Sequence, residues 1–104
     1  MLGQRVHERF PHRLPVEIVH DGQSYEGITH NISMGGMFIF TSLQVPFGTE
    51  FTLKTRLPET EEDLLVPVQV RWQRSDGMGV QYLSMAPGEE FALDRLLKSL
   101  RPPA

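Results

Sequence analysis

Apolar and polar residues alternate along most of this chain, and this period of two predicts β-strands. The pattern is clearest in residues 50–57 and in residues 65–74. In the second segment Trp72 falls on the same face as three valines, so we expect the indole to pack in the core. Residues 37–41 are almost continuously apolar, which is typical of a strand buried on both sides. Weaker strand patterns cover residues 16–20, 24–32 and 78–83.

Short polar segments separate these strands. Asp21-Gly22 is a tight-turn signal, Pro46 to Gly48 form a loop, and Ser75 to Gly77 turn the chain again. The acidic residues 58–63 form a solvated connection. Six or seven strands with short turns, and no helix between them, favour an antiparallel barrel or sandwich.

The period changes near the C-terminus. The apolar positions of residues 87–100 recur at three and four residues, which predicts an amphipathic helix. Pro87 suits the first helical position, and Pro102-Pro103 ends the pattern. A helix of this length is marginal on its own, so we expect its leucine face to pack on the strands.

Length and composition are those of one globular domain. The chain has 104 residues, of which 39% are hydrophobic, and a formal net charge of −3. This acidic balance argues against a nucleic acid polymer as partner. The chain has no cysteine, no apolar run long enough for a membrane span and a polar start unlike a secretory signal. We therefore expect a cytoplasmic protein with no membrane insertion.

Two short segments carry the candidate chemistry. The first contains Arg9 and Arg13, four residues apart and held out of a helix interior by Pro11. The second contains Asn31 and Ser33, followed by two glycines. Arginine presents a planar charged fork, which suits phosphate oxygens, the edge of guanine and stacking on a flat ring. The pair predicts a site for a flat anionic ligand such as a nucleotide.

In this order and spacing the two segments resemble the PilZ domain pattern, RxxxR followed by [D/N]xSxxG. The resemblance covers roughly residues 5–100. It implies an all-β fold, a six-stranded antiparallel barrel with a C-terminal helix at 87–100. It also implies a domain over residues 9–101, preceded by a flexible segment at 1–8, that binds the bacterial second messenger cyclic di-GMP. No cofactor, metal or enzymatic activity is implied.

The resemblance also implies roles for individual residues. Arg9 and Arg13 would clamp the ligand, with residues 1–13 becoming ordered on it, and Arg5 would add a third cation. Asn31 and Ser33 would accept hydrogen bonds from guanine. Gly35 and Gly36 would permit positive φ angles and close approach of the ligand. Trp72 is a secondary candidate as a stacking surface, and so is Gly79 as part of the site lining.

One alternative stays open. Glu8 lies where many family members carry another arginine, and asparagine replaces aspartate at position 31. Both changes favour an interaction module that has lost its nucleotide. In either case a chain of one domain would act through an unidentified effector protein, in motility, pilus or exopolysaccharide control, as a monomer or homodimer. A catalytic domain is disfavoured, because the four histidines lack metal-site spacing and no acid–base pair stands out.

Overall fold

The computed structural model describes residues 8–57 and 63–100, which form seven strands and one helix. The predictions of strands and of the C-terminal helix are confirmed, with shifts of one or two residues at the boundaries. The elements are β1 (Phe10–Pro11), β2 (Pro15–His20), β3 (Gln23–Ile32), β4 (Gly36–Phe40), β5 (Glu50–Thr55), β6 (Leu64–Arg74), β7 (Gly77–Tyr82) and α1 (Pro87–Leu100).

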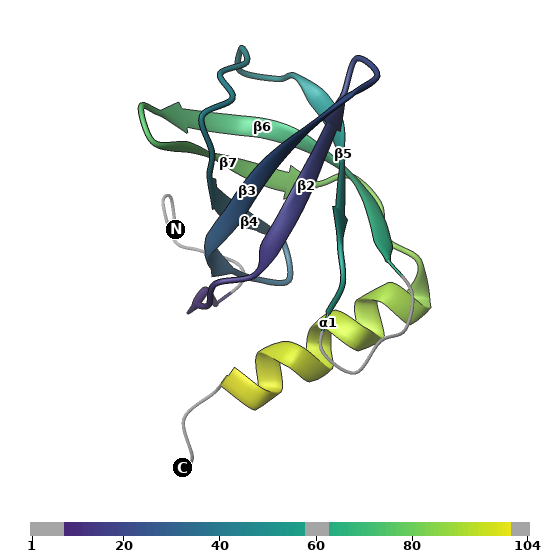
Figure 1. Cartoon of the computed structure of the whole chain (residues 1–104). Helices are drawn as coiled ribbons and strands as arrows, with labels where there is room; N and C mark the ends of the chain where they lie inside the picture. The colour runs from purple at the N-terminus through teal and green to yellow at the C-terminus, as the bar shows by residue number, and fades with distance from the viewer. Residues whose placement is uncertain (1–7, 58–62, 101–104) are drawn as a thin grey trace.

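Six strands close into an antiparallel barrel. Hydrogen-bonded neighbours follow the order β3-β2-β5-β6-β7-β4, and β4 pairs back onto β3 to complete the ring (Figure 1). Closure leaves no exposed sheet edge among these strands. The all-β barrel with a C-terminal helix, expected from the sequence, is confirmed.

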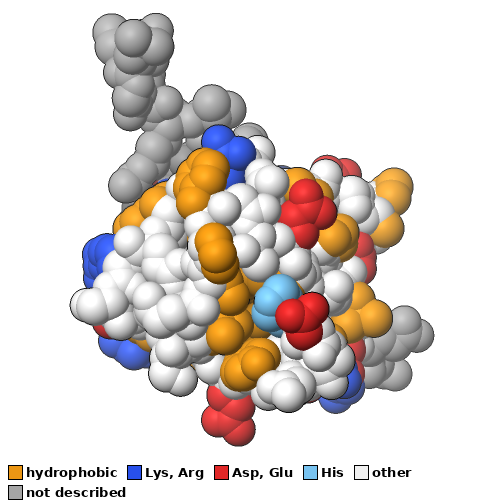
Figure 2. All heavy atoms as spheres, turned by 90° about the horizontal axis from the view of Figure 1, so that it is seen from above, with side chains coloured by type: hydrophobic (Ala, Val, Ile, Leu, Met, Phe, Trp, Pro, Cys, Tyr) orange, Lys and Arg blue, Asp and Glu red, His pale blue; other side chains and the backbone are white. Residues whose placement is uncertain are grey.

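The barrel interior holds the core, and its two ends are closed differently. Ile18, Ile32, Leu53 and Val68 have at most 1% of their surface exposed. At one end α1 lies across the opening and buries its leucine face. The other end, with the β2–β3 turn and the loop between β4 and β5, shows a line of hydrophobic side chains in Figure 2.

The β2–β3 turn follows the local signal in the sequence. Asp21 and Gly22 both have positive φ, 53° and 75°, as a two-residue hairpin turn with the right-handed twist of its strands requires.

Strand β1 was not expected. Phe10 is buried, with 5% of its surface exposed, and pairs with Ile32. This short strand therefore pairs with the end of β3, beyond the part of β3 that pairs with β2. Its two residues are too few to show a period. This pairing places residues 10–11 on the barrel, and the expected ordering of residues 1–13 on a ligand stays a prediction. The predicted flexible segment at 1–8 and the boundary at 101 fall largely outside the described residues, as does Arg5.

The prediction for Trp72 is wrong. The pairing of β6 with β7 shifts register between Val70 and Trp72, which is a β-bulge at Arg71. One extra residue reverses the alternation of facing. Val70 therefore points into the core, whereas Trp72 lies on the outer face with 42% of its surface exposed.

Candidate ligand-binding site

Pairing of β1 with β3 brings the two candidate segments together. Pro11 lies opposite Asn31 in this pairing. The Arg9 guanidinium donates a hydrogen bond of 2.8 Å from Nη1 to the Asn31 side-chain oxygen. Arg9 and Asn31 thus lie together on the barrel, although 22 residues separate them along the chain.

Ser33 organises the turn that follows β3. Its hydroxyl accepts hydrogen bonds of 3.1 Å from the backbone N–H groups of Gly35 and Gly36, and donates one to the Gly36 carbonyl. Only 3% of Ser33 is exposed. The expectation that this hydroxyl accepts directly from guanine is therefore not supported, because the turn itself occupies it. Ser33 shapes the site by holding the turn.

The glycines of this turn serve close packing of backbones. Gly36 begins β4, and a Cβ at this position would overlap the Val80 carbonyl oxygen on β7. The Gly35 carbonyl accepts a 3.1 Å hydrogen bond from the Tyr82 N–H. Among glycines in the described ranges, positive φ is recorded at Gly22 and Gly48. The expected reason for glycine at position 36 is therefore corrected, because that residue has the extended backbone of a strand.

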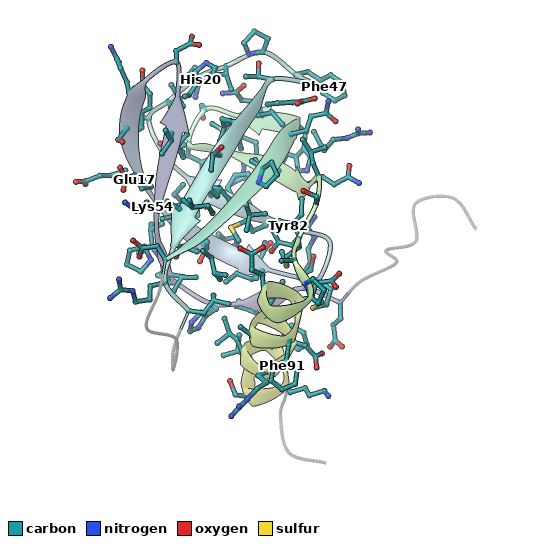
Figure 3. The ribbon with its side chains drawn as sticks, turned by 90° about the vertical axis from the view of Figure 1, so that its right-hand side faces the viewer. Glu17, His20, Phe47, Lys54, Tyr82 and Phe91 are labelled. Atoms are coloured by element: carbon teal, nitrogen blue, oxygen red, sulfur yellow. The ribbon has the colours of Figure 1, made fainter. Side chains whose placement is uncertain are left out.

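Tyr82 fixes the same turn from β7. Its hydroxyl donates to the Ser33 carbonyl at 3.0 Å and also lies 3.3 Å from the Gly36 carbonyl. Figure 3 shows Tyr82 at the end of the barrel beside α1. Burial raises the pKa of the Tyr82 phenol far above its usual value, and the positive charge of Arg9 opposes this only in part.

Replacing Tyr82 with phenylalanine tests this role. We expect a loss of about 1 kcal/mol in the free energy of unfolding, because one partly buried hydrogen bond is removed. The raised pKa means that the phenol stabilises the fold fully below the unfolded value of about 10, and that this contribution declines as the pH rises further. Urea unfolding from pH 7 to 11 should show a steeper decline for the wild type than for Tyr82→Phe. Parallel declines would contradict this assignment.

An aromatic surface lies next to Asn31 on the outer face of the barrel. Asn31 on β3 is opposite Phe38 on β4, and Phe38 is opposite Gly79 on β7. The Trp72 and Phe38 rings lie 5.0 Å apart at 30°. A Cβ at Gly79 would overlap the Trp72 indole. The glycine thus allows the indole to lie flat against β7, where it presents an exposed face for stacking.

The sequence analysis missed four residues of this surface: Phe38, Phe40, His30 and Arg74. The Arg74 guanidinium lies 4.6 Å above the Phe38 ring, and His30 lies 5.0 Å from the Phe40 ring. Arg13 lies 5.6 Å above the same Phe40 ring, which places this expected site residue on the same face. A hydrogen bond from Arg74 holds the pKa of the Asp76 carboxyl below its usual value. The bulge at Arg71, which put Trp72 outside, carried no local sequence signal.

The described part of the chain shows no group of three or more histidine, aspartate and glutamate residues that could hold a metal ion. The helix that the structure describes is also neither long nor apolar enough to cross a membrane.

Comparison with known proteins identifies a family. The family model described as PilZ domain matches residues 3–99. No curated protein matches the sequence. Among solved structures, the PilZ domain of CeSA from a cellulose-synthesizing bacterium is 24% identical, with a TM-score of 0.71. That match covers 89% of this chain and 97% of the CeSA domain.

Two further structures are similar in fold. The inhibitor of motility of Bacillus subtilis (MotI/DgrA) is 25% identical, with a TM-score of 0.77 over 94% of this chain and 51% of that protein. This chain thus spans about half the length of MotI. The PilZ domain of YcgR from Escherichia coli, solved with c-di-GMP, is 15% identical, with a TM-score of 0.74 over 93% of this chain and 91% of that domain.

Proposed function

Because this chain belongs to the PilZ domain family, we propose that it is a receptor for cyclic di-GMP, a binding module and not an enzyme. Arg9 and Arg13 hold the phosphates and stack on the bases, and Asn31 hydrogen-bonds to one guanine. Trp72, whose indole lies over Gly79, offers its exposed face to a purine. Ser33, Gly35 and Gly36 maintain the turn beside the ligand, and Arg5 is proposed as a further cation.

One observation carries the proposal. The hydrogen bond between Arg9 and Asn31 joins the two segments of the family pattern. Asn31 lies opposite Phe38, and the Phe38 ring is 5.0 Å from the exposed Trp72 indole. A cation, an amide and an aromatic face within one small area match the phosphate, the base edge and the base plane of a nucleotide.

The same contact suggests how binding is transmitted. Arg9 must exchange its bond to Asn31 for bonds to the ligand, so residues near β1 rearrange when cyclic di-GMP binds. A rearranged surface next to the ligand would then be read by an effector protein, in the control of motility, pilus function or exopolysaccharide production. We place this receptor in the cytoplasm, as monomer or homodimer.

The wild-type chain tests the proposal in one titration. Trp72 is the only tryptophan, so its fluorescence reports on the proposed stacking surface alone. We expect saturable heat in isothermal titration with cyclic di-GMP and a parallel change in Trp72 emission. Cyclic di-AMP serves as the control ligand. Absence of heat and of any shift in melting temperature at ligand concentrations well above micromolar would refute the receptor function.

A nucleotide-free adaptor is the second candidate, and the Arg9–Asn31 contact also favours it. In that contact two proposed ligand-binding side chains form a hydrogen bond with each other, in place of one with a nucleotide. On this reading Arg13→Ala leaves binding to a partner and the cellular phenotype unchanged, whereas a phenotype equal to that of deletion would count against it.

A further inference from the structure

A groove runs beside the proposed site, at the end of the barrel where α1 begins. Its walls are Met34 and Gly35 of the turn, Gln81 and Tyr82 of β7, the following segment 83–85, and Glu90 in the first turns of α1. Its volume is about 270 Å³. Sites for drug-sized ligands span roughly 300–1,000 Å³, so a groove just below this range has room for a flat base.

We propose that this groove receives one guanine base of cyclic di-GMP, and that Glu90, assisted by Gln81, recognises its Watson–Crick edge. This inference rests on the proposed function and names a second subsite within it. It assigns selectivity for guanine to residues outside both segments of the family pattern.

The position of the groove fits a ligand with two bases. Gln81 on β7 lies opposite Gly36 on β4, and Asn31 on β3 lies on the other side of β4. Asn31 is opposite Phe38, two residues along β4 from Gly36, so two strand spacings and two residues separate Asn31 from Gln81, about 12 Å. The two bases of a cyclic dinucleotide project from opposite sides of its ring. One base can therefore lie at each of the two positions.

The chemistry of the groove fits guanine. The Watson–Crick edge of guanine presents the N1–H and N2–H donors, and an ionised carboxylate accepts both with charge assistance. The Asn31 side-chain oxygen already accepts from Arg9, and the Ser33 hydroxyl is enclosed by its turn. Among the groove-lining residues in the described ranges, Glu90 supplies the carboxylate.

The surroundings keep this carboxylate available. In the described part of the chain Glu90 makes no ion pair, and it lies in the first turn of α1. Met34 and Met85 line the groove with flexible apolar side chains suited to the faces of a flat ring. A negative group is unfavourable beside a phosphate, so the groove selects the base and not the sugar–phosphate ring.

Titration of the full chain with two ligands tests the subsite. Cyclic di-IMP carries hypoxanthine, which lacks the 2-amino group of guanine. For Glu90→Gln we expect affinity for cyclic di-GMP to fall roughly tenfold, whereas affinity for cyclic di-IMP falls less, because one of the two donors is already absent. Gln81→Ala should weaken the binding of cyclic di-GMP severalfold. The control is Glu50→Gln, the same loss of charge at the start of β5, which should leave both affinities unchanged.

The outcomes separate the subsite from the receptor function. If Glu90→Gln loses the same affinity for both ligands, or loses none, the subsite is overturned while the receptor function stands. A wild-type chain that binds neither ligand refutes both. Melting temperatures of all variants close to that of the wild type establish that binding, and not folding, has changed.

Discussion

Replacing Arg9 with alanine is expected to weaken cyclic di-GMP binding by roughly tenfold to a hundredfold, as expected for one lost bidentate contact. Arg9 donates to Asn31 just before β1 pairs with β3, so its charge lies beside another proposed ligand-binding group. Arg13→Ala should have an effect of the same order. Isothermal titration at fixed salt measures both losses.

Two variants sharpen this test. Arg9→Lys keeps the charge but loses the planar fork, so it should recover only part of the affinity. Arg56→Ala removes an equal charge at an exposed ion pair with Asp63, and should bind as the wild type does. Equal affinities of Arg9→Ala and Arg56→Ala for cyclic di-GMP would show that Arg9 contributes only through the overall electrostatic field of the protein.

The Arg9–Asn31 contact predicts that the two residues are coupled. The double variant Arg9→Ala/Asn31→Ala should lose less affinity than the sum of the two single losses, because each single change also breaks the contact with the other residue. Strict additivity would indicate that the two side chains meet the ligand independently.

Replacing Gly36 with alanine is expected to destabilise the barrel by about 3 kcal/mol or more, a large share of the stability of a small domain. The added Cβ would overlap the Val80 carbonyl oxygen, and this atom belongs to the backbone of the neighbouring strand. No change of rotamer relieves such a clash. The paired strands β4 and β7 must separate, and the turn held by Ser33 and Tyr82 moves with them.

Chemical denaturation followed by circular dichroism measures this loss. Gly88→Ala is the matched control, because no atom lies within 4 Å of the position of its Cβ and the residue is helical. That substitution should be neutral or stabilise by up to about 1 kcal/mol. Equal unfolding midpoints for the two variants would show that Gly36 is not required for strand packing.

The sequence alone determined the architecture and the two segments of the site. Period-two alternation marked five of the strands and a continuous apolar run marked β4. The change to a helical period marked residues 87–100, because such patterns follow from local backbone geometry. The pair Asp21-Gly22 likewise predicted its turn, because few residues accept positive φ. The spacing of Arg9, Arg13, Asn31 and Ser33 indicated the family to which the chain belongs.

The tertiary structure decided which way the site residues face and what they contact. A single bulge residue, Arg71, moved Trp72 from the predicted core to the outer surface, and no period reveals such an insertion. Pairing of β1 with β3 placed Arg9 against Asn31, and packing of α1 at the end of the barrel set Glu90 and Gln81 around one groove. These arrangements join residues far apart in the chain, whereas sequence periodicity reports only on neighbouring residues.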